Sequence, residues 1–302
     1  MLSRVGENVY WMARYLERAQ NFSRVLAVRR AQGAQMLARE TNWPGLLRTF
    51  GDIHEPDGWD TRDLIHHAIF EGTCPISLRF TVERARENAR MAREIVSPEM
   101  WHVLTEMHAL LGARDSGQDD DTWDGLLNMV TMDALTFQAL VQSTLLHDEA
   151  YYFIQVGTTL ERALSTLFLL MSYLDNLAGW THEPLFAVNM LKSLTGYGAF
   201  RRSYRMSLSV PDVLEFLIFE KAFPRSLAGA SNSLQTAMNA LPEPWGPAKS
   251  KVGRLIAQLS YDTIEMVMDV TPVIYFSTLL DQFKTIHDDL SARYFQPEVQ
   301  EV

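Results

Sequence analysis

The sequence predicts an all-α fold, a multi-helix bundle of about ten helices with no β-sheet. Apolar residues recur every three to four positions along the 302 residues, which is the period of a helix that buries one face. No run alternates strictly between apolar and polar residues beside a hairpin turn, as half-buried strands do. Because 47% of the residues are apolar and no change in composition divides the chain, we expect one helical domain over residues 1–302.

The first predicted helix runs from Ser3, a suitable N-cap, to about Leu37. At 100° per residue it has an apolar face that includes Val9 and Leu16. The opposite face carries a line of polar and aromatic residues, namely Glu7, Trp11, Arg14, Arg18 and Asn21. Charged groups beside a core need partners, so this line predicts a semi-buried polar seam.

Capping residues, prolines and glycines delimit the other predicted helices. In the first half, a short helix lies in 42–52, one begins at Thr61, one runs from Pro75 to about Val96, one restarts at Ser97 and Pro98, and two long ones span 122–147 and 149–178. In the second half, one begins at Pro184 and is weakened by Gly196 and Gly198, two begin at Pro211 and Pro224, and two span 249–269 and 272–294 after the loop "PEPWGP".

The net charge of −10 comes from one segment. Residues 94–150 carry one Arg against 11 acidic residues, a balance of −10, so the two flanks together are neutral. The acids concentrate around 114–122, in "ARDSGQDDDTWDG", which is typical of a solvated connecting loop. An acidic protein lacks the basic surface that phosphate backbones require, so we expect no nucleic-acid partner.

The single cysteine, Cys74, excludes an intrachain disulfide and favours a reducing compartment. Charged residues interrupt the N-terminal stretch, which therefore does not have the layout of a signal peptide. The longest apolar run, "ALSTLFLLMSYL", is shorter than the roughly 20 residues needed to cross a bilayer. We therefore expect a cytoplasmic protein without a membrane partner.

The sequence offers no complete metal site or common catalytic motif. His66-His67 and the pair Glu99/His102 lack the further ligands that zinc or di-iron sites need. No phosphate-binding glycine loop, no G-x-S-x-G and no H-E-x-x-H occurs. We therefore expect no metal and no cofactor.

Arginines four residues apart recur along three predicted helices. These pairs are Arg14/Arg18, Arg86/Arg90 and Arg201/Arg205. Two like charges on one helix face repel, so each pair needs acidic partners. One interpretation is a ladder of salt bridges between helices. The other is a cleft in which the guanidinium groups bind a carboxylate or a phosphate.

A Glu-Arg-Ala triplet occurs three times, in "YLERAQN" at 15–21, "TVERARE" at 81–87 and "TLERALS" at 159–165. The spacings of 66 and 78 residues suggest helical-hairpin units of similar size. Ordinary surface Glu-Arg pairs explain the same triplets equally well.

Three stretches carry a family resemblance: "MLSRVGENVYWMARYLERAQNFSRVL", "SLRFTVERARENARMAREIV" at 77–96 and "GYGAFRRSYRMSLSVPDVLEFLIFEKAFPRSL" at 196–227. Together they resemble the bacterial alpha-E family, an all-helical family first catalogued as a domain of unknown function. The resemblance extends from Met1 to about Phe295. The matching positions are Glu7, Tyr10, Trp11, Arg14, Glu17, Arg18, Asn21, Arg86, Glu87, Asn88, Arg90, Glu161, Arg162, Tyr204, Phe223, Pro224, Arg225 and Ser226.

The resemblance implies a partner rather than a reaction. It points to a circularly permuted ATP-grasp protein, and further to a transglutaminase-like protein or a peptide substrate, within an amide-ligating, peptide-modifying system. The chain departs from the family pattern before its third Glu-Arg-Ala, where Thr158 and Thr159 stand in place of an expected Arg.

Three functions remain open at this point. The leading one is an accessory protein of an ATP-grasp amide ligase, with an Arg/Glu-lined cleft for a partner or an anionic ligand. The alternatives are an enzyme that uses Glu7 as general base and a structural helical scaffold. If the charged residues of the first helix and the arginine pairs of the other helices line one cleft, the accessory protein or the enzyme is favoured. If these stripes of charged residues lie apart on the molecule, the scaffold is favoured. The candidate binding residues are Glu7, Trp11, Arg14, Arg18, Asn21, Arg86, Glu87, Arg90, Glu161, Arg162, Arg201 and Arg225.

Overall fold

The computed structural model describes seven ranges of the chain: 3–35, 42–51, 58–113, 122–174, 184–204, 208–242 and 246–295. Helices make up 84% of these residues and no strand occurs among them, which confirms the all-α prediction. Within the described residues, no helix combines the length and the apolar character that a membrane span requires. The acidic loop predicted at 114–122 lies outside the described residues except for Thr122.

The described residues form fourteen helices, a few more than predicted. The first six are α1 Ser3–Gln35, α2 Trp43–Phe50, α3 Thr61–Phe70, α4 Leu78–Met91, α5 Pro98–Ala113 and α6 Trp123–Thr144. The other eight are α7 Glu149–Leu174, α8 Pro184–Ser193, α9 Tyr197–Ser203, α10 Val210–Phe219, α11 Leu227–Ala240, α12 Gly246–Tyr261, α13 Ile264–Val270 and α14 Pro272–Tyr294.

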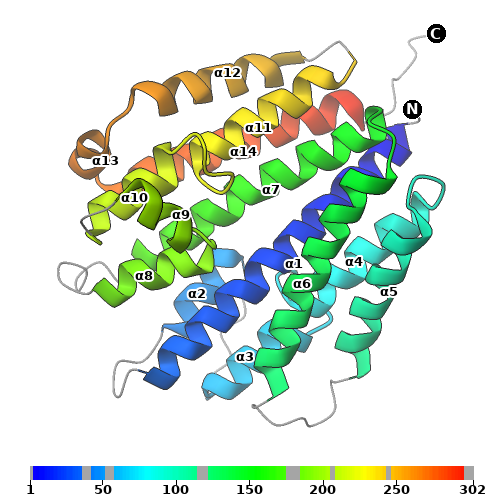
Figure 1. Ribbon diagram of the computed structural model, residues 1–302, viewed down its shortest axis with the longest axis horizontal. Coiled ribbons are helices and arrows are strands. Elements are labelled where there is room, and N and C mark those ends of the chain that lie inside the picture. Colours follow the sequence, from blue (N-terminus) through cyan, green and yellow to red (C-terminus); the bar gives the residue numbers. More distant parts are fainter. Residues whose placement is uncertain are drawn as a thin grey trace.

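The two halves of the chain share one helix topology. Helix α1 packs against α4 and α6 as α7 packs against α11 and α14, and α5 lies on α4 as α12 lies on α11. The matching helices also agree in length, with 10 residues in α3 and α10, 14 in α4 and α11, and 16 in α5 and α12. Figure 1 shows α1 and α7 side by side in the middle, with the remaining helices arranged around them.

Matching turns join α3 to α4 and α10 to α11. In the first turn, the hydroxyl of Ser77 donates to the carbonyl of Glu71 and accepts from the amide of Phe80. In the second, Ser226 makes the same two bonds, to the carbonyl of Glu220 and the amide of Gly229. Both helices therefore begin at a leucine that follows a serine N-cap.

These turns correct two predicted helix starts. The helices expected to begin at Pro75 and Pro224 begin three residues later, at Leu78 and Leu227, because each proline lies inside the turn that the serine cap closes. The first of them also ends at Met91 rather than near Val96, since residues 92–95 form a turn.

The helix predicted over 249–269 is also wrong, because the structure has two helices there, α12 and α13. The chain leaves the helix at Asp262, whose carboxylate accepts a hydrogen bond from the hydroxyl of Tyr275 at 2.9 Å. Thr263 is then extended, with φ −119° and ψ 164°. Asp and Thr side chains bond readily outside helices, which explains why the helix breaks here.

Helices α1 and α7 approach closely at Gly157. A Cβ atom on this residue would lie 2.5 Å from the carbonyl oxygen of Tyr10 and 3.2 Å from its ring. Further along, the Arg29 guanidinium lies 4.0 Å from the ring centroid of Tyr173. Residues that come later in α1 thus contact residues that come later in α7. The two helices are therefore parallel.

A methyl group at Gly157 should loosen this contact. We expect Gly157→Ala to lower the free energy of unfolding by about 1–3 kcal/mol, because a backbone oxygen cannot move aside as a side chain can. The matched control is Gly253→Ala in α12, where nothing lies within 4 Å of the added Cβ. That change should raise stability by about 0.5–1 kcal/mol through helix propensity. Urea unfolding measures both, and equal effects of the two changes would contradict the close approach.

Candidate functional site

Two Glu-Arg dipeptides face each other across α1 and α7. Glu17-Arg18 and Glu161-Arg162 stand 144 residues apart, at equivalent positions of the two halves. The Nε of Arg18 donates to Oε1 of Glu161 at 2.7 Å, and Arg162 donates through Nε and Nη2 to the carboxylate of Glu17, both at 3.1 Å. Each carboxylate thus pairs with the arginine of the other half.

Two further arginines complete this cluster. Nε of Arg14 donates to Oε2 of Glu161 at 2.8 Å, and Nη1 of Arg225, from the turn before α11, lies 3.1 Å from Oε1 of Glu17. We call these six residues the ER centre: Arg14, Glu17, Arg18, Glu161, Arg162 and Arg225.

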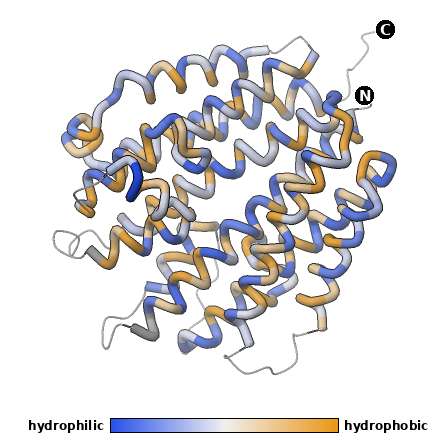
Figure 2. The backbone as a smooth tube through the Cα atoms, viewed as in Figure 1, coloured by the Kyte–Doolittle hydropathy of each residue, from blue (hydrophilic) through white to orange (hydrophobic). Residues whose placement is uncertain are grey.

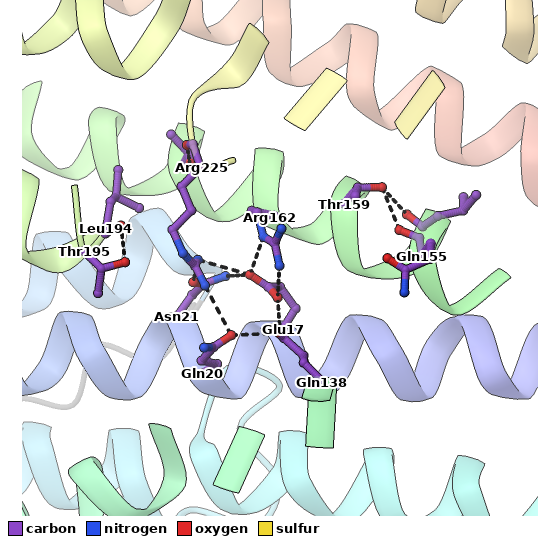
Figure 3. Close-up of polar contacts among 12 residues, drawn as sticks. Glu17, Gln20, Asn21, Gln138, Gln155, Thr159, Arg162, Leu194, Thr195 and Arg225 are labelled. Carbon is purple, nitrogen blue, oxygen red and sulfur yellow. Dashed lines mark hydrogen bonds and ion pairs between the residues drawn. The ribbon is translucent and has the colours of Figure 1, made fainter. Parts of the chain in front are cut away.

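Amide side chains from α1 and α6 surround Glu17 (Figure 3). Its carboxylate accepts from Nε2 of Gln138 at 2.7 Å and from Nδ2 of Asn21 at 3.1 Å. Arg225 donates in turn to Oδ1 of Asn21 and, at 3.2 Å, to Oε1 of Gln20. Of the predicted seam, Arg14, Arg18 and Asn21 therefore belong to this largely buried hydrogen-bond network.

Burial and charge act in opposite directions on the two carboxylates. Burial by itself raises the pKa of Glu17, but the charges of Arg162 and Arg225 outweigh it and lower the pKa to about 2. The pKa of Glu161 is likewise about 2, because Arg18 and Arg14 outweigh its burial. Both side chains are therefore ionised at neutral pH.

Positive charge is in excess around the ER centre. Arg24, one to two turns beyond Glu17 on α1, is only 8% exposed, and its Nη1 has no hydrogen-bond partner among the described residues. Burial and the neighbouring charges of Arg162 and Arg24 together lower the pKa of Arg225 to about 10, against the opposing effect of Glu17. Five guanidinium groups around two carboxylates leave three positive charges in excess.

An aromatic group closes the ER centre beside α14. The guanidinium of Arg14 lies 4.7 Å from the ring centroid of Trp11 and donates to the hydroxyl of Tyr10 at 3.3 Å. The same hydroxyl shares a hydrogen bond with Nδ1 of His287, at 2.7 Å. Burial raises the pKa of Tyr10 to about 12, and burial with the charge of Arg14 lowers the pKa of His287 to about 4. The pair is neutral across the physiological range.

A pocket of about 340 Å³ opens on the other side, between α1, α6 and α7. Its apolar wall consists of Ala13, Leu16, Leu135, Phe137, Ala139, Val141 and Ile154. Its polar groups belong to Gln138, Gln142, Gln155, Thr158 and Arg162. Arg162 therefore belongs both to this pocket and to the ER centre.

The symmetry of the halves explains why the pocket is open. Gln155 and Thr158 on α7 occupy the positions that Trp11 and Arg14 occupy on α1, 144 residues earlier. On the α1 side the larger residues fill the space against His287. On the α7 side the smaller side chains of Gln155 and Thr158 do not fill the corresponding space. Thr158 stands where the family pattern has an arginine, and its smaller side chain therefore helps to leave this pocket open.

The structure brings together only part of the predicted site. Six candidates lie in or directly against the ER centre: Arg14, Arg18, Asn21, Glu161, Arg162 and Arg225. Trp11 packs on Arg14, and Glu7 is half-buried one turn earlier on α1.

The other candidates lie elsewhere on the molecule. On α4, Arg86 packs on the ring of Trp101, with its Cζ 5.1 Å from the ring centroid, and Glu87 pairs with Arg90 at the exposed surface. Arg201 is exposed on α9, while Arg205 lies outside the described residues. The predicted stripes are therefore dispersed over α1, α4 and α9, the arrangement expected of a scaffold, and only the residues of α1 and α7 come together in the ER centre.

Sequence reasoning left several central residues out of the predicted site. Glu17 and Arg24 share a helix face with Asn21, and the repeated Glu-Arg-Ala was the signal that could have identified Glu17. The second triplet, with Glu83 and Arg84 exposed on α4, does not take part. No sequence signal marked Gln138 or His287, because only the packing of α6 and α14 brings them here.

The histidines considered for metal binding make other contacts. His67 packs on Trp59, with ring centroids 5.0 Å apart, and His102 lies 3.3 Å from the carboxylate of Glu106. In the described part of the chain, no three His, Cys, Asp or Glu side chains gather as metal ligands would.

Removing one buried carboxylate should destabilise the fold strongly. We expect Glu17→Gln to lower the free energy of unfolding by about 3–5 kcal/mol, because Arg162 and Arg225 would remain buried without a counter-charge. Glu87→Gln removes an exposed partner of Arg90 and serves as the matched control. Urea unfolding should show no measurable change for the control. A small effect of Glu17→Gln would contradict the role of the ER centre.

Acid should destabilise the protein in two pH ranges. The folded-state pKa of His287 is about 4 against an ordinary 6.5, and those of Glu17 and Glu161 are about 2 against 4.5. In each range the unfolded chain binds more protons, so stability falls as the pH drops from 6.5 to 4 and again from 4.5 to 2. The carboxylates should each account for about 3 kcal/mol.

Urea unfolding at a series of pH values measures this dependence. The variant His287→Gln should weaken the dependence between pH 6.5 and 4, to which the lowered pKa of the half-buried His108 also contributes, and should keep the dependence between pH 4.5 and 2. A wild-type stability that does not change above pH 4 would show that His287 is not held neutral by the fold.

Comparison with known proteins places these residues in a family context. The chain is 26% identical over 272 residues to uncharacterized proteins of Mycobacterium bovis and of Mycobacterium tuberculosis strain CDC 1551, an overlap of 82% of this chain and 30% of each relative. The chain thus spans less than a third of the length of these relatives. No solved structure matches it. The family described as a predicted alpha-helical domain with a conserved ER motif matches residues 1–295, and the chain therefore belongs to the Alpha-E family.

Proposed function

We propose that this Alpha-E domain is a cytoplasmic accessory protein of an ATP-grasp amide-ligating system, and that it binds a carboxylate-bearing part of a peptide substrate. The binding site is the pocket between α1, α6 and α7. The observation that carries this proposal is the position of Arg162, which lines the pocket and belongs to a centre with excess positive charge.

The charge of the site favours an anionic ligand. Buried ions are stable only when they are paired, and the two carboxylates of the ER centre do not balance its guanidinium groups. The hydrogen bonds of Arg162 to Glu17 use Nε and Nη2. Its Nη1 is therefore the group that a ligand carboxylate would meet.

The glutamines of the pocket match a peptide group. Oε1 of Gln142 already accepts from the hydroxyl of Tyr151, so the amide nitrogen of Gln142 is left to donate. Nε2 of Gln138 already donates to Glu17 and Gln20, so the carbonyl of Gln138 is left to accept. A volume of about 340 Å³ suits one or two residues of a peptide with a free carboxylate.

An accessory role is supported from outside the pocket. In the mycobacterial relatives the matched region is 30% of a longer protein, so the domain accompanies other sequence there. The family resemblance suggests a circularly permuted ATP-grasp protein as the main partner. It suggests a transglutaminase-like protein as a second partner.

The geometry favours binding over catalysis. An acid–base pair works best with pKa values near the working pH. The values of about 12 for Tyr10 and about 4 for His287 lie far from neutrality. Glu7, the general base of the enzyme alternative, lies on the aromatic side of α1 and does not line the pocket.

Filling the pocket should abolish binding. We expect acetyl-Ala-Ala with a free C-terminal carboxylate to bind the wild type about ten- to a hundredfold more tightly than its C-terminal amide, because one charge-assisted contact is lost. The variant Gln155→Trp copies Trp11 at the equivalent position and should block the pocket. Isothermal titration calorimetry measures both effects.

The matched control is Thr136→Trp, which adds the same side chain to the exposed face of α6. It should bind the peptide as the wild type does, and both variants should unfold at the wild-type temperature. Equal binding of the acid and the amide, or unchanged binding by Gln155→Trp, would contradict the proposed site.

A further inference from the structure

Exposed apolar side chains concentrate at one corner of the molecule. Among the described residues, six large apolar side chains of 261–274 are exposed, and they include Tyr261 at 83% and Ile274 at 57%. We call these six residues the α13 corner: Tyr261, Met266, Met268, Val270, Val273 and Ile274. Exposed apolar side chains that concentrate in one segment in this way indicate an interaction site.

The fold holds this corner away from the core. Within α13 only Val267 is fully buried and Ile264 is half-buried against the core, so the other side chains of the helix are exposed. Figure 1 shows α13 at the outer end of the bundle, where α12 and α14 meet, and Figure 2 shows apolar residues along it. Thr271, between α13 and α14, has φ 78°, which is a strained backbone for a β-branched residue.

The charged residues of the segment 261–274 are all acidic. Asp262, Glu265 and Asp269 lie among the apolar residues, and residues 261–274 include no Lys, Arg or His. The surface is therefore both apolar and acidic. Two of its apolar residues are methionines, whose flexible side chains adapt to a partner helix.

We propose that the α13 corner docks an amphipathic helix of a partner protein, with an apolar face bordered by Lys or Arg. Helices bind grooves and corners through apolar residues on one face, and the flanking charges select the partner. The basic border would meet Asp262, Glu265 and Asp269. This inference goes beyond the pocket, since no residue of the corner lines it.

The same charges disfavour two other occupants. In a symmetric dimer each residue meets the same patch of its copy, so the acidic groups would face one another. The surface of an anionic membrane would repel them as well. A basic-bordered helix is the occupant that satisfies both the apolar and the acidic side chains.

The test uses a fluorescein-labelled helical peptide of 18 residues, with Leu on one face and Lys along its borders. We expect it to bind the wild type and to bind Met266→Asp and Ile274→Asp at least tenfold more weakly, as measured by fluorescence anisotropy. Both variants make the corner more acidic, so weaker binding reports the lost apolar contact and not a lost charge.

Met132→Asp is the matched control, because Met132 is an exposed methionine of α6, far along the chain from the corner. This variant should bind the Lys-bordered peptide as the wild type does. A second peptide with Glu in place of Lys should bind the wild type at least tenfold more weakly. Thermal unfolding of each variant checks that the fold is intact, and the carboxylate peptide of the pocket should still bind.

Three results would overturn the proposal. Equal binding to Met266→Asp and Met132→Asp would mean that the peptide is attracted by the net charge alone. Equal binding of the Lys- and Glu-bordered peptides would remove the role of the acidic residues. A wild-type dimer in sedimentation equilibrium that Ile274→Asp dissociates would make a second copy the occupant.

Discussion

The reciprocal exchange of Glu and Arg between α1 and α7 is the interaction on which the rest of the structure depends. Each buried carboxylate obtains its arginine from the other half, so neither half can satisfy its own charges. Because the two pairs cross in opposite senses, sliding one helix along the other would lengthen either the Arg18–Glu161 pair or the Arg162–Glu17 pair. The ion pairs therefore fix the register of two parallel helices that apolar packing alone would leave less defined. They also make the two halves one cooperative unit.

The two halves share a framework and differ in what surrounds the shared ion pairs. Around α1, Tyr10, Trp11 and His287 form a packed aromatic group that has no acid–base character near neutral pH. Around α7, Gln155 and Thr158 stand at the matching positions and leave a pocket. The two halves thus share a framework, but the larger residues Trp11 and Arg14 make the α1 side a packed structural region. The smaller residues Gln155 and Thr158 leave the α7 side open to a ligand.

The sequence predicted the fold class and most helices because periodicity and capping are local properties. The errors at Pro75, Pro224 and Asp262 arose where a side chain bonds to a group in a neighbouring turn or helix. The site was harder to predict. Arg86/Arg90 and Arg14/Arg18 look alike in sequence, yet only the second pair faces α7, and that depends on contacts between residues about 145 positions apart. The glutamines of the pocket carried no local signal.

The long separation of the ER partners also has a consequence during synthesis. Glu17 leaves the ribosome well before Arg162, and at roughly 5–20 residues per second the interval is roughly 7–30 s. For that time the nascent first half holds a carboxylate and several guanidinium groups on a helix whose polar face has no counterpart. Water must solvate these groups, which delays their burial. The ion pairs of the ER centre therefore cannot form before α7 has been synthesised.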